Sequence, residues 1–125
     1  MPKRPPLHAK ADDKARERRN DQARGSARAR GYTAQWDREA RAFLLLNPVC
    51  AYCDADGRTA AAKVVDHLYP QRQWPGAFWE RRWWVPSCRP CHDGMKQQVE
   101  RQGREAIDDL ARRLGMPTMG EAARG

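Results

Sequence analysis

The four cysteines of the chain form two pairs with the same spacing. They are Cys50 with Cys53, and Cys88 with Cys91. Two residues between the members of a pair let both thiolates reach one metal ion from a single turn of backbone. Two such pairs complete the tetrahedron of a closed structural zinc site. The presence of a second pair argues against the two alternatives, buried free thiols and a redox pair. The spacing therefore predicts a structural zinc ion.

One acidic residue and two histidines accompany the cysteine pairs. Asp66 and His67 are consecutive and lie between the pairs, and His92 directly follows the last cysteine. A carboxylate and an imidazole can hold one divalent ion and leave its other positions for water and phosphate oxygens. The unperturbed pKa of histidine, about 6.5, suits a general base at neutral pH. We therefore predict phosphodiester hydrolysis, in which Asp66 and His92 hold the ion and His67 takes a proton from the attacking water.

Ordinary roles would also explain each histidine by itself. His67 would then be a capping or hydrogen-bonded loop residue, and His92 a surface residue. Their occurrence together with a cysteine quartet on a basic chain favours the catalytic interpretation. On a helix, Lys96 would share the face of His92 at position i+4 and could contact a phosphate. Three further candidate DNA contacts are Arg72, Arg81 and Arg82.

The elements that position these residues are short. Thr33 can cap a helix that ends at Asn47-Pro48, because the residue before a proline avoids the helical conformation. Along this helix the apolar residues that share one face are Trp36, Ala40, Phe43 and Leu44. We expect strands at residues 62–65 and 83–85, a loop over 68–82, a helix over 91–102, and a last helix with Ile107, Leu110 and Leu114 that stops at Gly115.

The composition limits what the chain can be. It has 125 residues, with 24 Lys and Arg against 16 Asp and Glu, which gives a formal charge of +8. That length suits at most one ordinary domain. No apolar run approaches the roughly 18 residues needed to cross a bilayer, and no apolar segment of a secretory signal follows the basic start. We therefore expect a cytoplasmic protein with reduced cysteines and no membrane partner.

Most of the positive charge lies in the first quarter of the chain. Residues 1–31 contain ten Lys and Arg against four Asp and Glu, and their only large apolar side chains are Met1 and Leu7. Such a segment buries too little surface to offset the entropy of ordering. We predict a disordered basic arm that contacts nucleic-acid phosphates, with a solubilising tail as the alternative.

Taken together, the motifs resemble those of the HNH endonucleases, the zinc-stapled ββα-metal nucleases, and most of all the small stand-alone HNH proteins of tailed phages and prophages. The resemblance runs from Gly31 to about Lys96. It rests on Asn47-Pro48-Val49-Cys50-Ala51-Tyr52-Cys53, Val64-Val65-Asp66-His67-Leu68-Tyr69-Pro70, Phe78-Trp79-Glu80, Trp84 and Cys88-Arg89-Pro90-Cys91-His92-Asp93. It implies metal-dependent nicking or cleavage of DNA. Carried over by position, Asp66 and His92 are ligands of a catalytic Mg²⁺, Mn²⁺ or other divalent ion, His67 is the general base, and the cysteines hold structural Zn²⁺.

The resemblance also implies an architecture and partners. The expected fold is α+β, a small ββα-metal core stapled by a four-cysteine zinc site, with flanking helices and the disordered basic arm. The expected segments are the arm over 1–31, the HNH nuclease domain with its leading helix over 32–102, and a C-terminal helix and tail over 103–125. DNA is the expected substrate, a phage packaging terminase is a candidate partner, and the cytoplasm of a bacterial host or phage-infected cell is the expected compartment.

Of the departures from the family pattern, which include Glu80 in place of the common Asp and Lys96 one residue later than usual, one matters. Trp83 stands where the middle asparagine of the family is expected, within Glu80-Arg81-Arg82-Trp83-Trp84. In the family this asparagine is thought to brace the loop that holds the general base. An amide both donates and accepts hydrogen bonds, whereas an indole only donates. We therefore expect Trp83→Asn to raise activity or leave it unchanged, unless Trp83 fixes the loop by packing.

Two functions without catalysis remain open on the sequence. The first is a zinc-stabilised DNA-binding module, in which the arm, the arginines and the tryptophans bind DNA without cutting it. The tryptophans concerned are Trp74, Trp79, Trp83 and Trp84. The second is a protein-interaction adaptor with exposed tryptophans at an interface. Metal-dependent nicking would exclude both alternatives.

Overall fold

The computed structural model describes residues 14–16 and 28–124. The chain divides into two compact units, residues 1–37 and residues 38–125. Most of the predicted arm over residues 1–31 lies outside the described residues. Within the described ranges, no helix is both long enough and apolar enough to cross a membrane.

Helix α2 (Ala34–Leu46) has the bounds that the sequence predicts. The hydroxyl of Thr33 accepts a hydrogen bond from the backbone amide of Trp36 at 3.3 Å, as an N-cap residue does. At the other end, the amide of Asn47 donates to the carbonyl of Phe43 at 2.9 Å, and Pro48 prevents a further turn. The Phe43 ring meets Trp84 edge-on, with ring centroids 5.6 Å apart.

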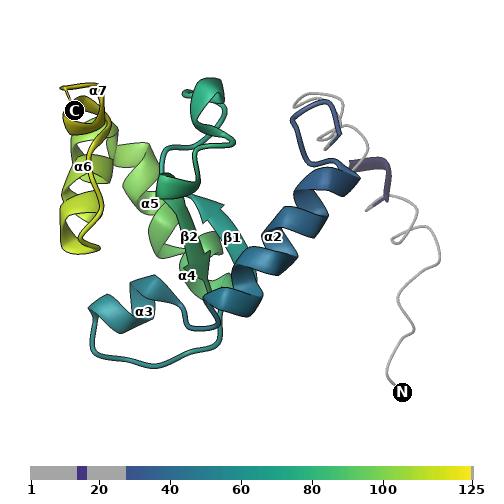
Figure 1. The fold of residues 1–125 in the computed structure, drawn as a ribbon, viewed down its shortest axis with the longest axis horizontal. Helices are drawn as coiled ribbons and strands as arrows, with labels where there is room; N and C mark the ends of the chain where they lie inside the picture. Colours follow the sequence, from purple (N-terminus) through teal and green to yellow (C-terminus); the bar gives the residue numbers. More distant parts are fainter. Residues whose placement is uncertain (1–13, 17–27, 125) are drawn as a thin grey trace, which may run out of the picture. The chain divides into compact units, whose positions relative to one another are not determined.

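Two antiparallel strands lie at the centre of the unit formed by residues 38–125 (Figure 1). Strand β1 (Val64–His67) pairs with strand β2 (Trp84–Ser87), so that Asp66 lies opposite Val85 and His67 opposite Trp84. Strand β1 begins two residues later than the predicted strand at 62–65, and β2 begins one residue later than the predicted strand at 83–85. As a result Asp66 and His67 are part of β1, and both are buried.

The connection between the strands closes on itself rather than running free. It contains two short 3₁₀ turns, η1 (Pro75–Ala77) and η2 (Arg81–Trp83). The amide of Leu68 donates to the carbonyl of Trp83 at 2.9 Å, which extends the strand pairing into the start and end of this loop. Leu68 and Tyr69 are fully buried, and the ring of Tyr69 packs against Trp83 with centroids 5.1 Å apart.

Each cysteine pair opens a short helix. Helix α3 (Ala51–Ala55) follows Cys50, and helix α4 (Arg89–Asp93) follows Cys88. Pro90 is tolerated in the first turn of α4, where its missing N–H would have no helical partner.

The single helix predicted over residues 91–102 is wrong, because the chain breaks at Gly94. Helix α4 ends before Gly94, and helix α5 (Met95–Gln102) begins after it. A β-carbon at Gly94 would lie only 2.9 Å from the carbonyl oxygen of Pro90, a distance that side chains essentially never show. The close approach explains why a glycine stands at this break, and the break changes the direction in which Lys96 points.

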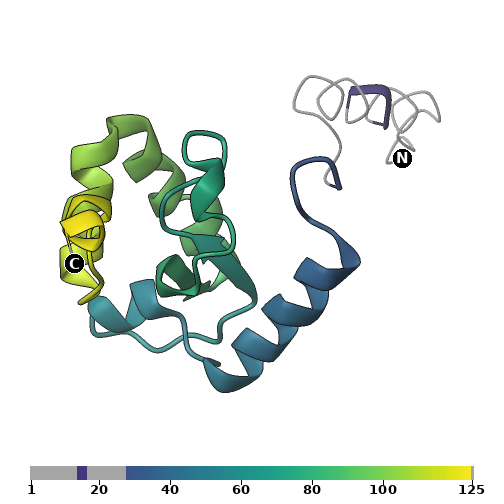
Figure 2. The ribbon, with the colours of Figure 1, turned by 45° about the horizontal axis from the view of Figure 1, so that its top comes forward.

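The C-terminal part of the chain packs two helices onto the core. Helix α6 (Arg104–Arg113) buries Ile107 and Leu110, as its apolar pattern predicts. Its end lies close to α3 (Figure 2), where Arg113 pairs with Asp56.

A second C-terminal helix, α7 (Met119–Arg124), was not predicted from the sequence. Its first turn carries a capping box. The amide of Glu121 donates to the Thr118 hydroxyl and the amide of Thr118 donates to the Glu121 carboxylate, both at 3.2 Å. Two aromatic residues of the inter-strand loop hold the start of this segment. Tyr69 accepts a hydrogen bond from the amide of Met119, and Trp83 donates one to the carbonyl of Pro117.

Candidate metal centre and catalytic cluster

The four cysteines converge on one point between α3 and α4. Their sulfur atoms all lie within 4.8 Å of one another, and all four residues are buried. The Sγ of Cys53 lies 3.8 Å from that of Cys88 and 3.6 Å from that of Cys91. A tetrahedral zinc ion with Zn–S bonds of about 2.3 Å separates its sulfur ligands by about 3.8 Å. The observed spacings therefore fit a structural zinc ion.

The surroundings of the thiols also suit a cation. Burial raises the pKa of the Cys50 thiol, but hydrogen bonds from the backbone amides of Cys53 and Cys88 outweigh burial and lower that pKa to about 7. Burial, followed by hydrogen bonds to Cys88 and Cys53, raises the pKa of Cys91. Thiolates packed this closely repel one another unless a cation lies between them. The pKa of Cys50 is thus lowered and that of Cys91 raised, and a cation between the sulfur atoms would favour the thiolate form.

Asp66 presents its two carboxylate oxygens to different partners. Oδ2 accepts a hydrogen bond from the Tyr52 hydroxyl and lies 3.2 Å from the ammonium of Lys96. Oδ1 faces Nε2 of His92 at 3.7 Å. Burial, and then the charge of Asp66, raises the pKa of Tyr52 well above its ordinary value, so the phenol stays a hydrogen-bond donor.

His92 lies one residue beyond the last cysteine, on α4, and its side chain is 39% exposed. Its Nδ1 lies 2.9 Å from a carboxylate oxygen of Asp93. Because a carboxylate only accepts, Nδ1 of a neutral ring carries the hydrogen and the lone pair is on Nε2. Two lone-pair atoms, Asp66 Oδ1 and His92 Nε2, then face each other. Ligand atoms about 2.1 Å from one ion lie at most about 4.2 Å apart, so the 3.7 Å separation suits a shared divalent cation.

His67 follows Asp66 at the end of β1, and its ring is held by Phe78 of the inter-strand loop. Its Nε2 lies 3.0 Å from the carbonyl oxygen of Phe78, and its ring lies 4.4 Å from the Phe78 ring, centroid to centroid. A carbonyl oxygen only accepts, so Nε2 carries the hydrogen and the neutral imidazole has its basic lone pair on Nδ1. Burial lowers the pKa of His67, against the opposing charge of Asp66. The ring is therefore neutral at pH 7 and able to accept a proton.

The prediction that Lys96 contacts DNA is wrong. Its side chain is fully buried, and its ammonium pairs with Asp66 and Glu100 and donates to the carbonyl of His67. The break at Gly94 turns α5 away from the direction of α4, so Lys96 does not share an exposed helical face with His92. Lys96 instead points inward, toward Asp66, Glu100 and the His67 carbonyl.

The other three predicted DNA contacts lie at the surface of the inter-strand loop. Arg72 is exposed. Arg81 pairs with Glu39 of α2 and lies over the Trp84 ring, and Arg82 lies 3.4 Å from Glu80 and over the Trp83 ring.

Trp83 occupies the position of the expected asparagine but is a packing residue. It is 4% exposed, contacts the Tyr69 ring, and donates its indole hydrogen to the carbonyl of Pro117 at 2.9 Å. The neighbouring Trp84 donates to the same Phe78 carbonyl that faces His67, at 2.9 Å. Aromatic packing together with these indole hydrogen bonds therefore holds the loop.

Three residues that orient Asp66, His92 and His67 were not predicted from the sequence. Tyr52 lies between the first two cysteines, where only its large size and its hydroxyl distinguish it. Asp93 follows His92, and an acidic residue beside a histidine is a usable signal for a hydrogen-bonded imidazole. Phe78 acts through its backbone carbonyl, which no residue type reveals.

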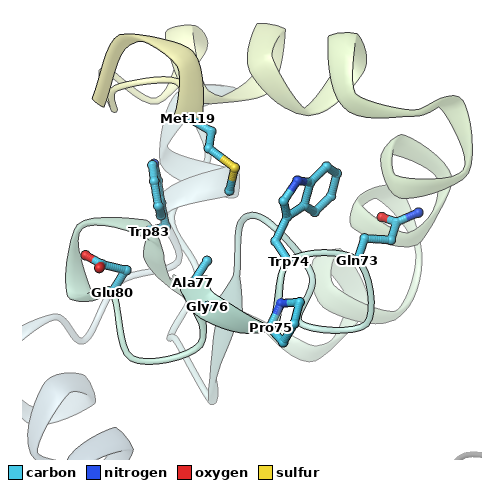
Figure 3. A pocket seen from close by; sticks show the side chains of 8 residues that line it. All are labelled: Gln73, Trp74, Pro75, Gly76, Ala77, Glu80, Trp83 and Met119. Carbon is cyan, nitrogen blue, oxygen red and sulfur yellow. The ribbon is translucent and has the colours of Figure 1, made fainter. Parts of the chain in front are cut away.

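An apolar hollow lies apart from this cluster. It has a volume of about 400 Å³ and is lined by Gln73, Trp74, Pro75, Gly76, Ala77, Glu80, Trp83 and Met119. Figure 3 shows Trp74, Trp83 and Met119 around it, from the inter-strand loop and α7. Its lining includes none of the candidate catalytic residues, and it marks where α7 meets the loop.

Comparison with known proteins bears on the fold. A scan against models of known protein families found no match, and neither did a search of curated proteins. Among solved structures, the chain is similar to the HNH endonuclease of the deep-sea thermophilic bacteriophage GVE2, crystallised with a manganese ion. The similarity covers 72% of this chain and 95% of that chain, with a TM-score of 0.53 and 24% sequence identity. The predicted fold class is confirmed: a two-stranded sheet among short helices, with four adjacent cysteines, gives this chain the fold of an HNH-type endonuclease.

Proposed function

We propose that this protein is a metal-dependent endonuclease that nicks or cleaves DNA by phosphodiester hydrolysis. The observation that carries the proposal is the facing pair of Asp66 Oδ1 and His92 Nε2, 3.7 Å apart, with His67 next to Asp66 on β1. The GVE2 enzyme, which shares the fold, was crystallised with manganese. In this chain Asp66 and His92 would hold a catalytic Mg²⁺, Mn²⁺ or similar ion, and the four cysteines would hold structural zinc.

Each residue has a defined task in the reaction. When bound, the divalent ion supplies charge stabilisation for the phosphate oxygens and the departing oxygen. Nδ1 of His67 takes a proton from a water molecule, whose oxygen then forms a bond to phosphorus. The bond between phosphorus and the bridging sugar oxygen breaks, and that oxygen leaves with its electron pair and takes up a proton from solvent. Before the transfer, the Phe78 carbonyl accepts the hydrogen of His67 Nε2 and so keeps the basic lone pair on Nδ1; the imidazolium then returns its proton to solvent.

Positive charge would hold the DNA in place. Arg72, Arg81 and Arg82 are exposed on the loop between the strands, and the basic segment over residues 1–31 carries most of the net charge. Neutralised phosphates release counterions, so binding through these groups weakens as salt rises.

Plasmid nicking tests the proposal. The zinc-loaded protein should convert supercoiled plasmid to the open-circular form with Mg²⁺, Mn²⁺ or Ni²⁺, and EDTA should stop the reaction. His67→Ala should abolish nicking while zinc content, melting temperature and DNA affinity stay close to those of the wild type. Gln98→Ala, on the exposed side of α5, is a control that should cut normally.

Two results would contradict the proposal. Undiminished nicking by His67→Ala would exclude this histidine as the base. A wild-type protein that binds DNA but cuts with none of the three ions would support the zinc-stabilised binding module instead.

A further inference from the structure

Lys96 is a buried cation in the middle of the catalytic cluster. Its side chain is fully buried, and its ammonium has three acceptors: Asp66 Oδ2 at 3.2 Å, the His67 carbonyl at 2.9 Å and Glu100 Oε2 at 3.4 Å. The ammonium donates a hydrogen bond to the His67 carbonyl and forms ion pairs with the carboxylates of Asp66 and Glu100. Burial of a charge is costly unless it is fully paired, and this one is paired mainly with the two consecutive residues of the catalytic motif.

The partners of Lys96 decide which oxygen of Asp66 is available. Oδ2 is engaged by both the ammonium of Lys96 and the hydroxyl of Tyr52. Oδ1 is the oxygen directed at His92. A carboxylate held in this way offers one oxygen to an ion between Asp66 and His92, rather than both.

On the basis of the proposed function, we propose that Lys96 is a positioning residue and internal counter-charge, which restricts Asp66 to a single metal-binding oxygen. Asp66 and Glu100 both pair with Lys96, so the ammonium offsets one of the two negative charges that it contacts. Without the ammonium, the ion would meet a more negative site and a carboxylate whose Oδ2 is held by the Tyr52 hydroxyl alone. It would bind more tightly, with fewer positions left for water and phosphate.

Lys96 also acts on the neighbouring general base. Its hydrogen bond to the His67 carbonyl, at 2.9 Å, ties the backbone of β1 to α5 at the residue that would take the proton. One side chain thus sets the position of both consecutive catalytic residues. Removal of the Lys96 ammonium should therefore lower the cutting rate at saturating metal, even though the metal binds more tightly.

The test compares Lys96→Met with Lys63→Met in the full zinc-loaded chain. Lys63 is exposed and lies just before β1, so it provides the same substitution without the buried ion pairs. Mn²⁺ titration followed by electron paramagnetic resonance measures affinity without any need for cutting. We expect Lys96→Met to bind Mn²⁺ about tenfold more tightly, because a unit positive charge is removed from beside the ion. We expect at least about tenfold slower nicking at saturating Mn²⁺, because Asp66 and His67 are no longer oriented by the ammonium. Lys63→Met should match the wild type in both.

A purely structural role for Lys96 would weaken metal binding or leave it unchanged, and either result in folded Lys96→Met would overturn the proposal. If that variant does not fold, Glu100→Gln decides, because Glu100 is 25% exposed and its change leaves Lys96 its other two acceptors. We expect Mn²⁺ binding to weaken severalfold in Glu100→Gln, and unchanged affinity would overturn the proposal.

Failure of the proposed function would look different. Mn²⁺ that binds the wild type and is lost in Asp66→Asn, without any DNA cutting, would leave the Lys96 proposal testable by affinity alone. It would remove only the nuclease assignment.

Discussion

Cys91 and His92 are consecutive on α4 but face two clusters of different construction. Cys91 is 8% exposed and joins three other cysteines whose sulfur atoms all lie within 4.8 Å. His92 has a side chain that is 39% exposed and faces a single oxygen of Asp66. All four residues of the cysteine cluster would bind the metal ion themselves. The geometry of the Asp66–His92 pair is instead set by neighbouring residues that would not touch the ion.

The two clusters therefore differ in which residues fix their geometry. Four thiols at two fixed spacings define a tetrahedron by themselves. At the open pair, Tyr52 and Lys96 direct Asp66, and Asp93 directs His92. Substitutions should therefore affect the two clusters in different ways, with the largest effects at the cysteines.

The largest effect is expected at the closed cluster. Cys91→Ala should lose the zinc ion and with it the cooperative fold, because a structural zinc site supplies about 10 kcal/mol or more of folding free energy. Metal analysis and thermal melting by circular dichroism measure both losses. A folded, zinc-free Cys91→Ala protein would show that the cluster is not a structural metal site.

The adjacent residue should give the opposite result. We expect His92→Ala to keep its zinc and to melt within a few degrees of the wild type, because the side chain is 39% exposed. Nicking should fall by at least about 100-fold, since half of the protein ligands of the catalytic ion are removed. Loss of the fold in this variant would mean that the two clusters cannot be separated.

Trp83→Asn tests how the loop that contacts His67 is fixed. From the packing of this residue we expect a loss of stability of about 3–4 kcal/mol, because a buried indole and its hydrogen bond to Pro117 are removed. Nicking should fall with it. Trp79→Asn is the matched control, since Trp79 is 45% exposed and the same change should cost less than about 1 kcal/mol. Faster nicking with unchanged melting would instead support a missing asparagine brace.

The smallest effect is expected from the basic segment. Deletion of residues 1–30 should weaken DNA binding and flatten its dependence on salt, by about 0.9 in the log–log slope for each phosphate that the protein no longer neutralises. Cutting at saturating DNA should be retained. Binding measured across a salt series provides the test. An unchanged slope would make the segment a solubilising tail.

Structural features that depend only on neighbouring residues could be predicted from the sequence. Thr33 and Asn47-Pro48 fixed the ends of α2, because capping and the proline restriction act within a few residues. The spacing within each cysteine pair is local in the same way, whereas the meeting of the two pairs was predicted from the four ligands that one tetrahedral zinc ion needs. Strand positions were harder to predict, since a run as short as Ala62–Val65 does not define which residues pair.

Long-range interactions outside the proposed metal-ligand sets could not be predicted. The direction of Lys96 depends on the break at Gly94, which a continuous helical pattern conceals. The role of Trp83 depends on Pro117, 34 residues away in the sequence, and the partner of His67 is a backbone carbonyl. Such interactions are set by how the elements pack, and residue type carries almost no signal for them.

Because Cys91 and His92 are adjacent, the position of His92 would depend on the zinc cluster, whereas the zinc cluster would not depend on an ion at His92. A mild chelator that removes only the loosely held ion would leave α4 in place, and added Mn²⁺ would restore cutting at once. A chelator strong enough to extract zinc would dismantle the turn that carries His92, and recovery would then require refolding with zinc. Inhibition by EDTA would then have two stages, the first reversible by addition of metal and the second not.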